Sequence, residues 1–248
     1  RQSALSSRHR QRRVVASLEG EIHELRAELR HRSGDVDGEE ADLRAAIAAF
    51  QKLAADGTAD HRSAWMRARV SLLTHLDQAQ RTEPLDGLLP EVLADARQLV
   101  IDHPLPQSLR FLSTVLLLRS VRLTATDAKT EAEEALREAV RLEAEIGPAH
   151  EFVTASAHSL YSQQLAKRGD AARATEVADA GFRLVLGRLK AQAGSRQPVG
   201  FVRSRAQYLL QLLDRARSLP AMVEVADALW AVAPKQLPIA DIALLALD

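Results

Sequence analysis

The sequence predicts an all-α fold of paired amphipathic helices. Apolar residues recur at intervals of three and four along most of the 248 residues, and the alternation expected of half-buried strands is nearly absent. Glycine and proline interrupt this pattern about once per helix. With 46% hydrophobic residues and no cysteine, the chain is long enough to bury a core without disulfides.

The first half of the chain is expected to form five helices. The first ends near Gly34, and the second opens at Asp37, where Glu40 three residues later resembles a capping box. A break at Pro84 with Asp86-Gly87 separates the third from the fourth. The fifth is apolar on nearly every side, which indicates a centrally packed helix. The first helix carries a stripe of Val15, Leu18, Ile22, Leu25 and Leu29, and the others cover about 37–57, 60–80, 89–103 and 106–123.

Six more helices are expected in the second half. A turn at Gly169-Asp170 joins the seventh to the eighth. The last is a short helix with Ile239, Ile242 and Leu245, which either caps the fold or leaves an apolar patch through which two copies could form a homodimer. The apolar stripes of the sixth to tenth cover about 126–147, 152–165, 177–189, 201–213 and 222–234.

Several of these helices share a rhythm of small and apolar residues. Ala46 is followed by Phe50, and similar runs surround Ala135 and Ala174. Proline stops at residues 104, 148, 198 and 234 lie 44, 50 and 36 residues apart, which indicates an irregular internal repeat.

At these residues the chain resembles the tetratricopeptide repeat (TPR) family, in which helix pairs carry small, aromatic and proline positions in a fixed order. The best match is the segment 165–174, with Gly169-Asp170 as the interhelical turn and Ala174 at the small position. The resemblance implies a right-handed array of antiparallel helix pairs over residues 37–234, with close helix contacts at Ala46, Ala135 and Ala174. Divergent arrays of this kind are similar to those appended to bacterial signalling proteins such as serine/threonine kinases.

The flanking segments are interpreted as a basic arm with an N-terminal helix over residues 1–36 and a capping helix over 235–248. Such an arm either binds phosphate groups of lipid or nucleic acid, or is a frayed connector to a preceding domain. The absence of an aromatic residue for base stacking favours the connector. The basic residues that precede the first acidic one, Glu19, are Arg1, Arg8, His9, Arg10, Arg12 and Arg13.

No pattern of residues predicts a catalytic, cofactor-binding or metal-binding site. Gly181 and Gly187 have neither the spacing nor the Lys-Ser/Thr of a phosphate loop and are interpreted as helix-packing residues, and His23-Glu24 lacks a second histidine four residues on. We therefore expect no catalysis, cofactor or metal. The 33 basic and 33 acidic residues provide no global field for nucleic acid, and the longest apolar run, 115–118, is too short to span a membrane. A cytoplasmic location is expected.

The expected function is that of a non-catalytic protein–protein interaction or regulatory module in a larger protein. The alternative is a ligand-sensing helical domain that binds a small molecule or peptide and regulates an attached effector domain. The TPR resemblance places partner-binding residues on the first helix of each pair, and the absence of asparagine argues against the family's carboxylate clamp. We expect these side chains to be accessible, so that reversing the charges of the first two would hardly alter folding. The candidates are Arg67, Arg69, Gln163, Gln164, Arg203 and Gln207.

Overall fold

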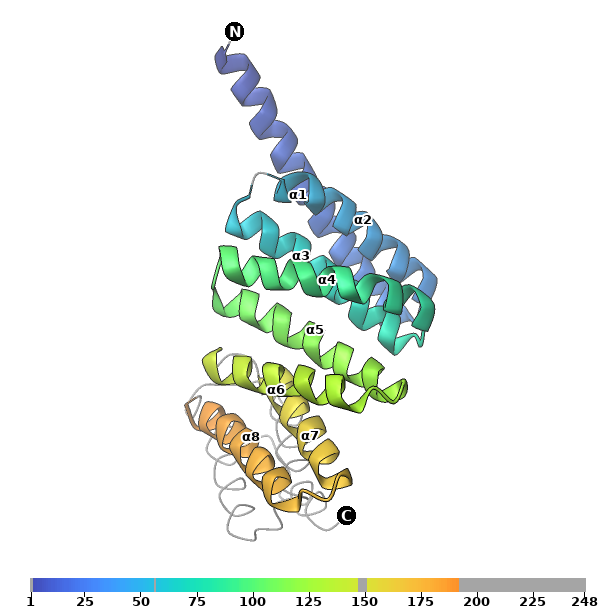
Figure 1. The fold of residues 1–248 in the computed structure, drawn as a ribbon. Helices are drawn as coiled ribbons and strands as arrows, with labels where there is room; N and C mark the ends of the chain where they lie inside the picture. Colours follow the sequence, from blue (N-terminus) through green and yellow to red (C-terminus); the bar gives the residue numbers. More distant parts are fainter. Residues whose placement is uncertain (1, 56, 147–150, 192–248) are drawn as a thin grey trace, which may run out of the picture. The chain divides into compact units, whose positions relative to one another are not determined.

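The computed structural model describes residues 2–55, 57–146 and 151–191 and forms eight helices there, with no strand in these ranges (Figure 1). The all-α prediction is therefore confirmed. The chain divides into two compact units, residues 1–122 and 123–248. The helices are α1 (Gln2–Ser33), α2 (Val36–Ala54), α3 (Ala59–Gln78), α4 (Thr82–Asp102), α5 (Pro106–Ala125), α6 (Lys129–Glu145), α7 (Glu151–Lys167) and α8 (Ala171–Ala191).

Tight turns set the ends of the first helices. Gly34 has φ of 75°, a left-handed conformation that ends α1 at little steric cost. The side chain of Asp35 then accepts a hydrogen bond from the backbone N–H of Gly38 at 3.0 Å and caps α2. The cap is therefore Asp35 and not the expected Asp37, because the turn places Asp35 directly before the first helical residue.

The predicted break at Pro84 is wrong. The chain turns at Gln80, with φ of 57°, and α4 begins at Thr82, so that Pro84 lies in its first turn and Gly87 in its interior. Proline is tolerated there because the first N–H groups of a helix have no intrahelical acceptor. Similarly, α6 begins at Lys129 and not at Thr126, because Asp127 has φ of 62°.

The apolar stripe of α1 faces solvent, although the apolar face of an amphipathic helix usually packs on the core. The buried face consists of the small residues Ala16, Gly20 and Ala27, which let α2 approach closely. A Cβ added at Gly20 would lie 2.5 Å from the ring of Phe50, which is itself 1% exposed. The basic segment is part of the same helix, since α1 is continuous from Gln2.

In the second unit, α6, α7 and α8 follow one another with short connections, and the predicted turn at Gly169-Asp170 is confirmed. Gly169 has φ of 85°, and Asp170 accepts a hydrogen bond from the backbone N–H of Arg173 at 3.2 Å. Ala135 and Ala174 are buried, as Ala46 is in the first unit, which agrees with their expected close helix contacts. The predicted ninth to eleventh helices lie outside the described residues.

The two glycines of α8 differ in role. A Cβ at Gly181 would lie 2.5 Å from the Cβ of the buried His158 on α7, whereas a Cβ at Gly187 would meet no atom of the described residues within 4 Å. The prediction that both are packing residues therefore holds for Gly181 alone.

These glycines yield a paired prediction. Gly181→Ala should lower the free energy of unfolding, because overpacking costs about 1–3 kcal/mol. Gly187→Ala should raise it by up to about 1 kcal/mol, the gain in helix propensity from glycine to alanine. Urea denaturation of both variants measures the change in the free energy of unfolding. A change of the same sign in the two variants would contradict the close α7–α8 contact.

Among the described helices, none is both long and apolar enough to cross a membrane.

Candidate functional site

The two predicted arginines of α3 lie on different sides of the helix, and both are held by acidic residues of neighbouring helices. Arg67 is half-buried and binds Glu24 of α1 in a bidentate manner, with N–O distances of 2.9 and 2.6 Å. This hydrogen bonding raises the pKa of the Arg67 guanidinium against the opposing effect of burial. Arg67 therefore joins α3 to α1.

Arg69 is 3% exposed, so the expectation of an accessible side chain is wrong for this residue. Its guanidinium donates to Glu91 at 2.7 Å and to Asp95, both on α4, and lies 4.5 Å from the ring centroid of Trp65. Since α3 has α2 on one side and α4 on another, a polar residue off its apolar stripe is covered by the next helix.

The remaining predicted residues lie in the second unit. Gln163 and Gln164 are half-buried on α7, where Gln163 donates to Ser159 at 3.3 Å and Gln164 donates to Thr124 at 2.8 Å. Arg203 and Gln207 lie outside the described residues. Their partner-binding role, like that of the two arginines, stays a prediction.

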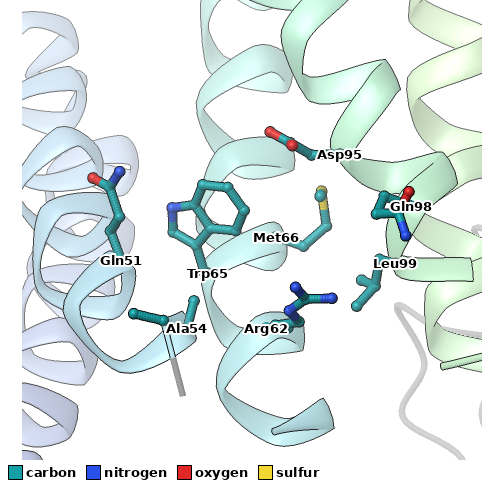
Figure 2. Close-up of a pocket in the computed structure, with 9 residues that line it drawn as sticks. Gln51, Ala54, Arg62, Trp65, Met66, Asp95, Gln98 and Leu99 are labelled. Carbon is teal, nitrogen blue, oxygen red and sulfur yellow. The ribbon is translucent and has the colours of Figure 1, made fainter. Parts of the chain in front are cut away.

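The first unit contains a pocket of about 360 Å³ over α3, between the C-terminal end of α2 and the C-terminal half of α4 (Figure 2). Its apolar surface is formed mainly by Trp65 and Met66, with Leu99 at the side of α4. Met66 and Leu99 are buried, whereas Trp65 packs one part of its ring on the core and remains partly exposed. The other lining residues are Gln51, Ala54, Ala55, Arg62, Asp95 and Gln98.

The charged groups of this pocket are paired with one another or with neighbours. Arg62 donates to Asp102, and Asp95 accepts from Arg69. The pKa of the Asp102 carboxyl is lowered, first by the hydrogen bond from Arg62 and then by that from Gln98. The rim therefore offers neutral amide groups and compensated charges, and it favours neither acidic nor basic ligands.

One polar atom beside the pocket lacks a partner. The indole Nε1 of Trp65 is buried and finds no acceptor within the described part of the chain. A buried donor left unpaired costs about 1–3 kcal/mol. Trp65 was not among the predicted partner-binding residues, because an aromatic residue on the apolar face of a helix is typical of a core.

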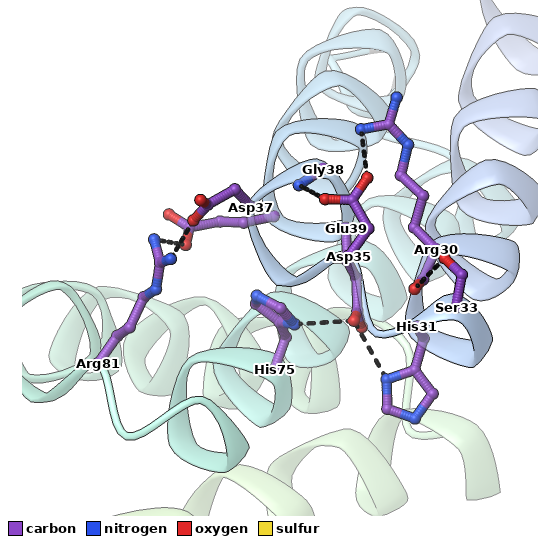
Figure 3. A network of polar contacts seen from close by, with 10 residues as sticks. Arg30, His31, Ser33, Asp35, Asp37, Gly38, Glu39, His75 and Arg81 are labelled. Atoms are coloured by element: carbon purple, nitrogen blue, oxygen red, sulfur yellow. Dashed lines mark hydrogen bonds and ion pairs between the residues drawn. The ribbon is translucent and has the colours of Figure 1, made fainter.

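A second polar cluster joins the C-terminal end of α1, the N-terminal end of α2 and the C-terminal end of α3 (Figure 3). Glu39 lies 3.1 Å from the Nδ1 atoms of both His31 and the buried His75. Arg81 binds Asp37 and Glu40 of α2, and hydrogen bonding to Asp37 is the largest cause of its raised pKa. These contacts link the ends of α1, α2 and α3. In the described ranges no group of three or more histidines and carboxylates has an arrangement that could hold a metal ion.

Comparison with known proteins shows a likeness in fold. No family model matches the sequence, and no curated protein is similar enough to count as a relative. The crystal structure of BtubC (BKLC) from P. vanneervenii is 15% identical, with 85% of this chain and 80% of that chain covered and a TM-score of 0.56. Two MamA structures, each 14% identical, cover 89% and 82% of this chain and 97% and 93% of their own, with TM-scores of 0.38 and 0.35.

The helices of the described residues and the likeness in fold to BtubC both indicate an all-helical fold. The fold is all-α, a TPR-like array of antiparallel helix pairs.

Proposed function

We propose that this chain is a non-catalytic protein-interaction module, and that the pocket over α3 receives an apolar side chain from a peptide segment of the partner. One observation carries the proposal: three helices leave Trp65 partly exposed, next to the buried Met66, inside a rim whose charges are already paired. An apolar side chain would gain about 25 cal/mol for each Å² that it buries there. The amides of Gln51 and Gln98 can donate to and accept from a peptide backbone.

The finer part of the proposal concerns context. We infer a regulatory role in a larger bacterial signalling protein, such as a serine/threonine kinase, in the cytoplasm. The support is the TPR resemblance at residues 165–174 and the internal repeat of helix pairs. The partner is then either a separate protein or another domain of the same parent chain.

The test uses peptides selected from a random library displayed on phage, with the full chain as bait. We expect Trp65→Ala to weaken the selected peptides by at least about tenfold, because aromatic anchors in pockets contribute most of the binding energy. Gln98→Arg, on the exposed rim, should also weaken them without lowering the melting temperature. The control is Arg141→Gln on the exposed side of α6, whose side chain is 70% accessible.

Fluorescence anisotropy titration of each labelled peptide measures the affinities. Equal affinity for the wild type, Trp65→Ala and Gln98→Arg would place the peptide site elsewhere.

The pocket volume favours one second candidate, the ligand sensor. About 360 Å³ lies within the range of about 300–1,000 Å³ typical of small-molecule sites. A panel of metabolites tested by thermal shift would identify such a ligand. If a metabolite raises the melting temperature of the wild type but not of Trp65→Ala, and selected peptides do not bind, the sensor replaces the peptide module.

A further inference from the structure

The outer face of α1 carries a continuous apolar stripe exposed to solvent. Its side chains are between 48% and 65% exposed, although all are large and aliphatic. No other described helix has such a row among its exposed large hydrophobic residues. The residues are Val15, Leu18, Ile22, Leu25 and Leu29.

The stripe faces away from the first unit. Ala16, Gly20 and Ala27, on the opposite side of the same helix, are buried. Because α1 has 32 residues and α2 has 19, α1 also continues past the end of α2 as a projecting helix (Figure 1). The stripe is therefore open to a second helix along its full length.

The spacing of the stripe is that of a coiled coil. Its residues are separated by three, four, three and four positions, the a and d pattern of a heptad repeat. Val15, Ile22 and Leu29 occupy a positions, the first two of them β-branched, and Leu18 and Leu25 occupy d positions. A β-branched residue at a with leucine at d favours parallel two-stranded coiled coils.

We propose that the outer face of α1 pairs with α1 of a second copy of this chain to form a parallel coiled-coil dimer. Charge complementarity supports this occupant. In parallel alignment, Glu21 at g of one copy faces Arg26 at e of the other, twice by symmetry. Both side chains are exposed, although Arg26 also lies 3.6 Å from Asp42 and Glu21 accepts from Ser17 within the chain.

In an antiparallel alignment with Ile22 opposite Leu25, Glu21 would instead face Glu28, a repulsive pair, while Arg26 would face Glu19, an attractive pair. The parallel alignment has attractive pairs alone.

The dimer is expected to be weak and concentration-dependent, because its seam covers only two heptads. Packing on α2 already holds α1 helical, so association does not bear the cost of forming the helix. This inference concerns a surface distinct from the pocket over α3 and does not depend on the proposed peptide binding.

Sedimentation equilibrium of the full chain from about 2 to about 200 µM tests the dimer, since an oligomer must dissociate on dilution by mass action. We expect a monomer–dimer equilibrium in the wild type. Leu25→Glu should lower the association constant by at least about tenfold, one tenfold step being about 1.4 kcal/mol, with an unchanged circular dichroism spectrum. The control Ile101→Glu alters a residue of α4 that is 73% exposed and should associate as the wild type does.

Cross-linking tests the orientation, because the chain contains no cysteine. Val15→Cys should form a disulfide with itself under mild oxidation only if the helices are parallel. Mixing Glu21→Arg with Arg26→Glu should restore association that each variant alone has lost, since both facing pairs then become attractive.

Three results would overturn the proposal. They are a wild type that stays monomeric up to the highest concentration, a dimer unaffected by Leu25→Glu, and a cross-link that forms only between Leu18→Cys and Leu29→Cys chains. The last would indicate an antiparallel pair.

Discussion

Arg69→Glu should destabilise the first unit by about 3–5 kcal/mol, the range found when a buried ion pair loses one partner. The arginine side chain is only 4% accessible and binds Glu91 and Asp95. A glutamate there would place a third carboxylate beside these two with almost no access to water. The sequence alone predicts that charge reversal at Arg67 and Arg69 leaves folding almost unchanged. The buried position of Arg69 instead predicts a large loss of stability.

Two control variants separate charge from packing. Arg69→Met keeps most of the side-chain volume and leaves Glu91 and Asp95 with side-chain accessibilities of 68% and 35%, so water can solvate them. We expect its loss to be well below that of Arg69→Glu. Arg141→Glu, an exposed reversal on α6, should change stability by less than about 1 kcal/mol.

Guanidinium denaturation in a Trp230→Phe background measures these effects, because Trp65 is then the single tryptophan and lies against Arg69. A midpoint for Arg69→Glu close to that of the parent would contradict the buried position of this arginine.

Phe50→Ala should cost about 3–5 kcal/mol, because a large, fully buried aromatic side chain is removed. Gly20→Val alone should also destabilise, since its Cβ would lie 2.5 Å from the Phe50 ring and overpacking costs about 1–3 kcal/mol. In the Phe50→Ala background, however, the valine fills part of the cavity. The double variant should therefore be more stable than Phe50→Ala.

The same denaturation assay gives the full double-mutant cycle. Simple addition of the two losses would show that Gly20 and Phe50 are not in contact. A Gly87→Ala variant serves as the control for helix propensity, because a Cβ at this glycine of α4 meets no described atom within 4 Å.

The helical period was sufficient to predict the all-α fold and most helix bounds, because each described helix buries a face with that period. It could not predict which side of α1 is buried. A helix with large aliphatic residues on one face and small ones on the other can pack by either, and close approach to Phe50 selects the small face through Gly20. Pattern alone does not distinguish a core stripe from one available to another chain.

The candidate site was predicted less well. Arg67 and Arg69 were chosen because they lie off the apolar stripe of α3, but the helices on either side supply acidic partners to both. The pocket combines residues up to 48 positions apart, Gln51 to Leu99, on three helices. Its only local signal was Trp65 next to Met66, which is also typical of a core.

The most direct measurement of the central claim is the emission of Trp65 in the Trp230→Phe background as a selected peptide is added. Peptide binding in the pocket over α3 should shift the emission maximum of Trp65 and saturate with the affinity found by anisotropy. Gln98→Arg should lower the affinity measured by emission and the affinity measured by anisotropy by the same factor. Saturable binding by anisotropy with no change in Trp65 emission would contradict the account.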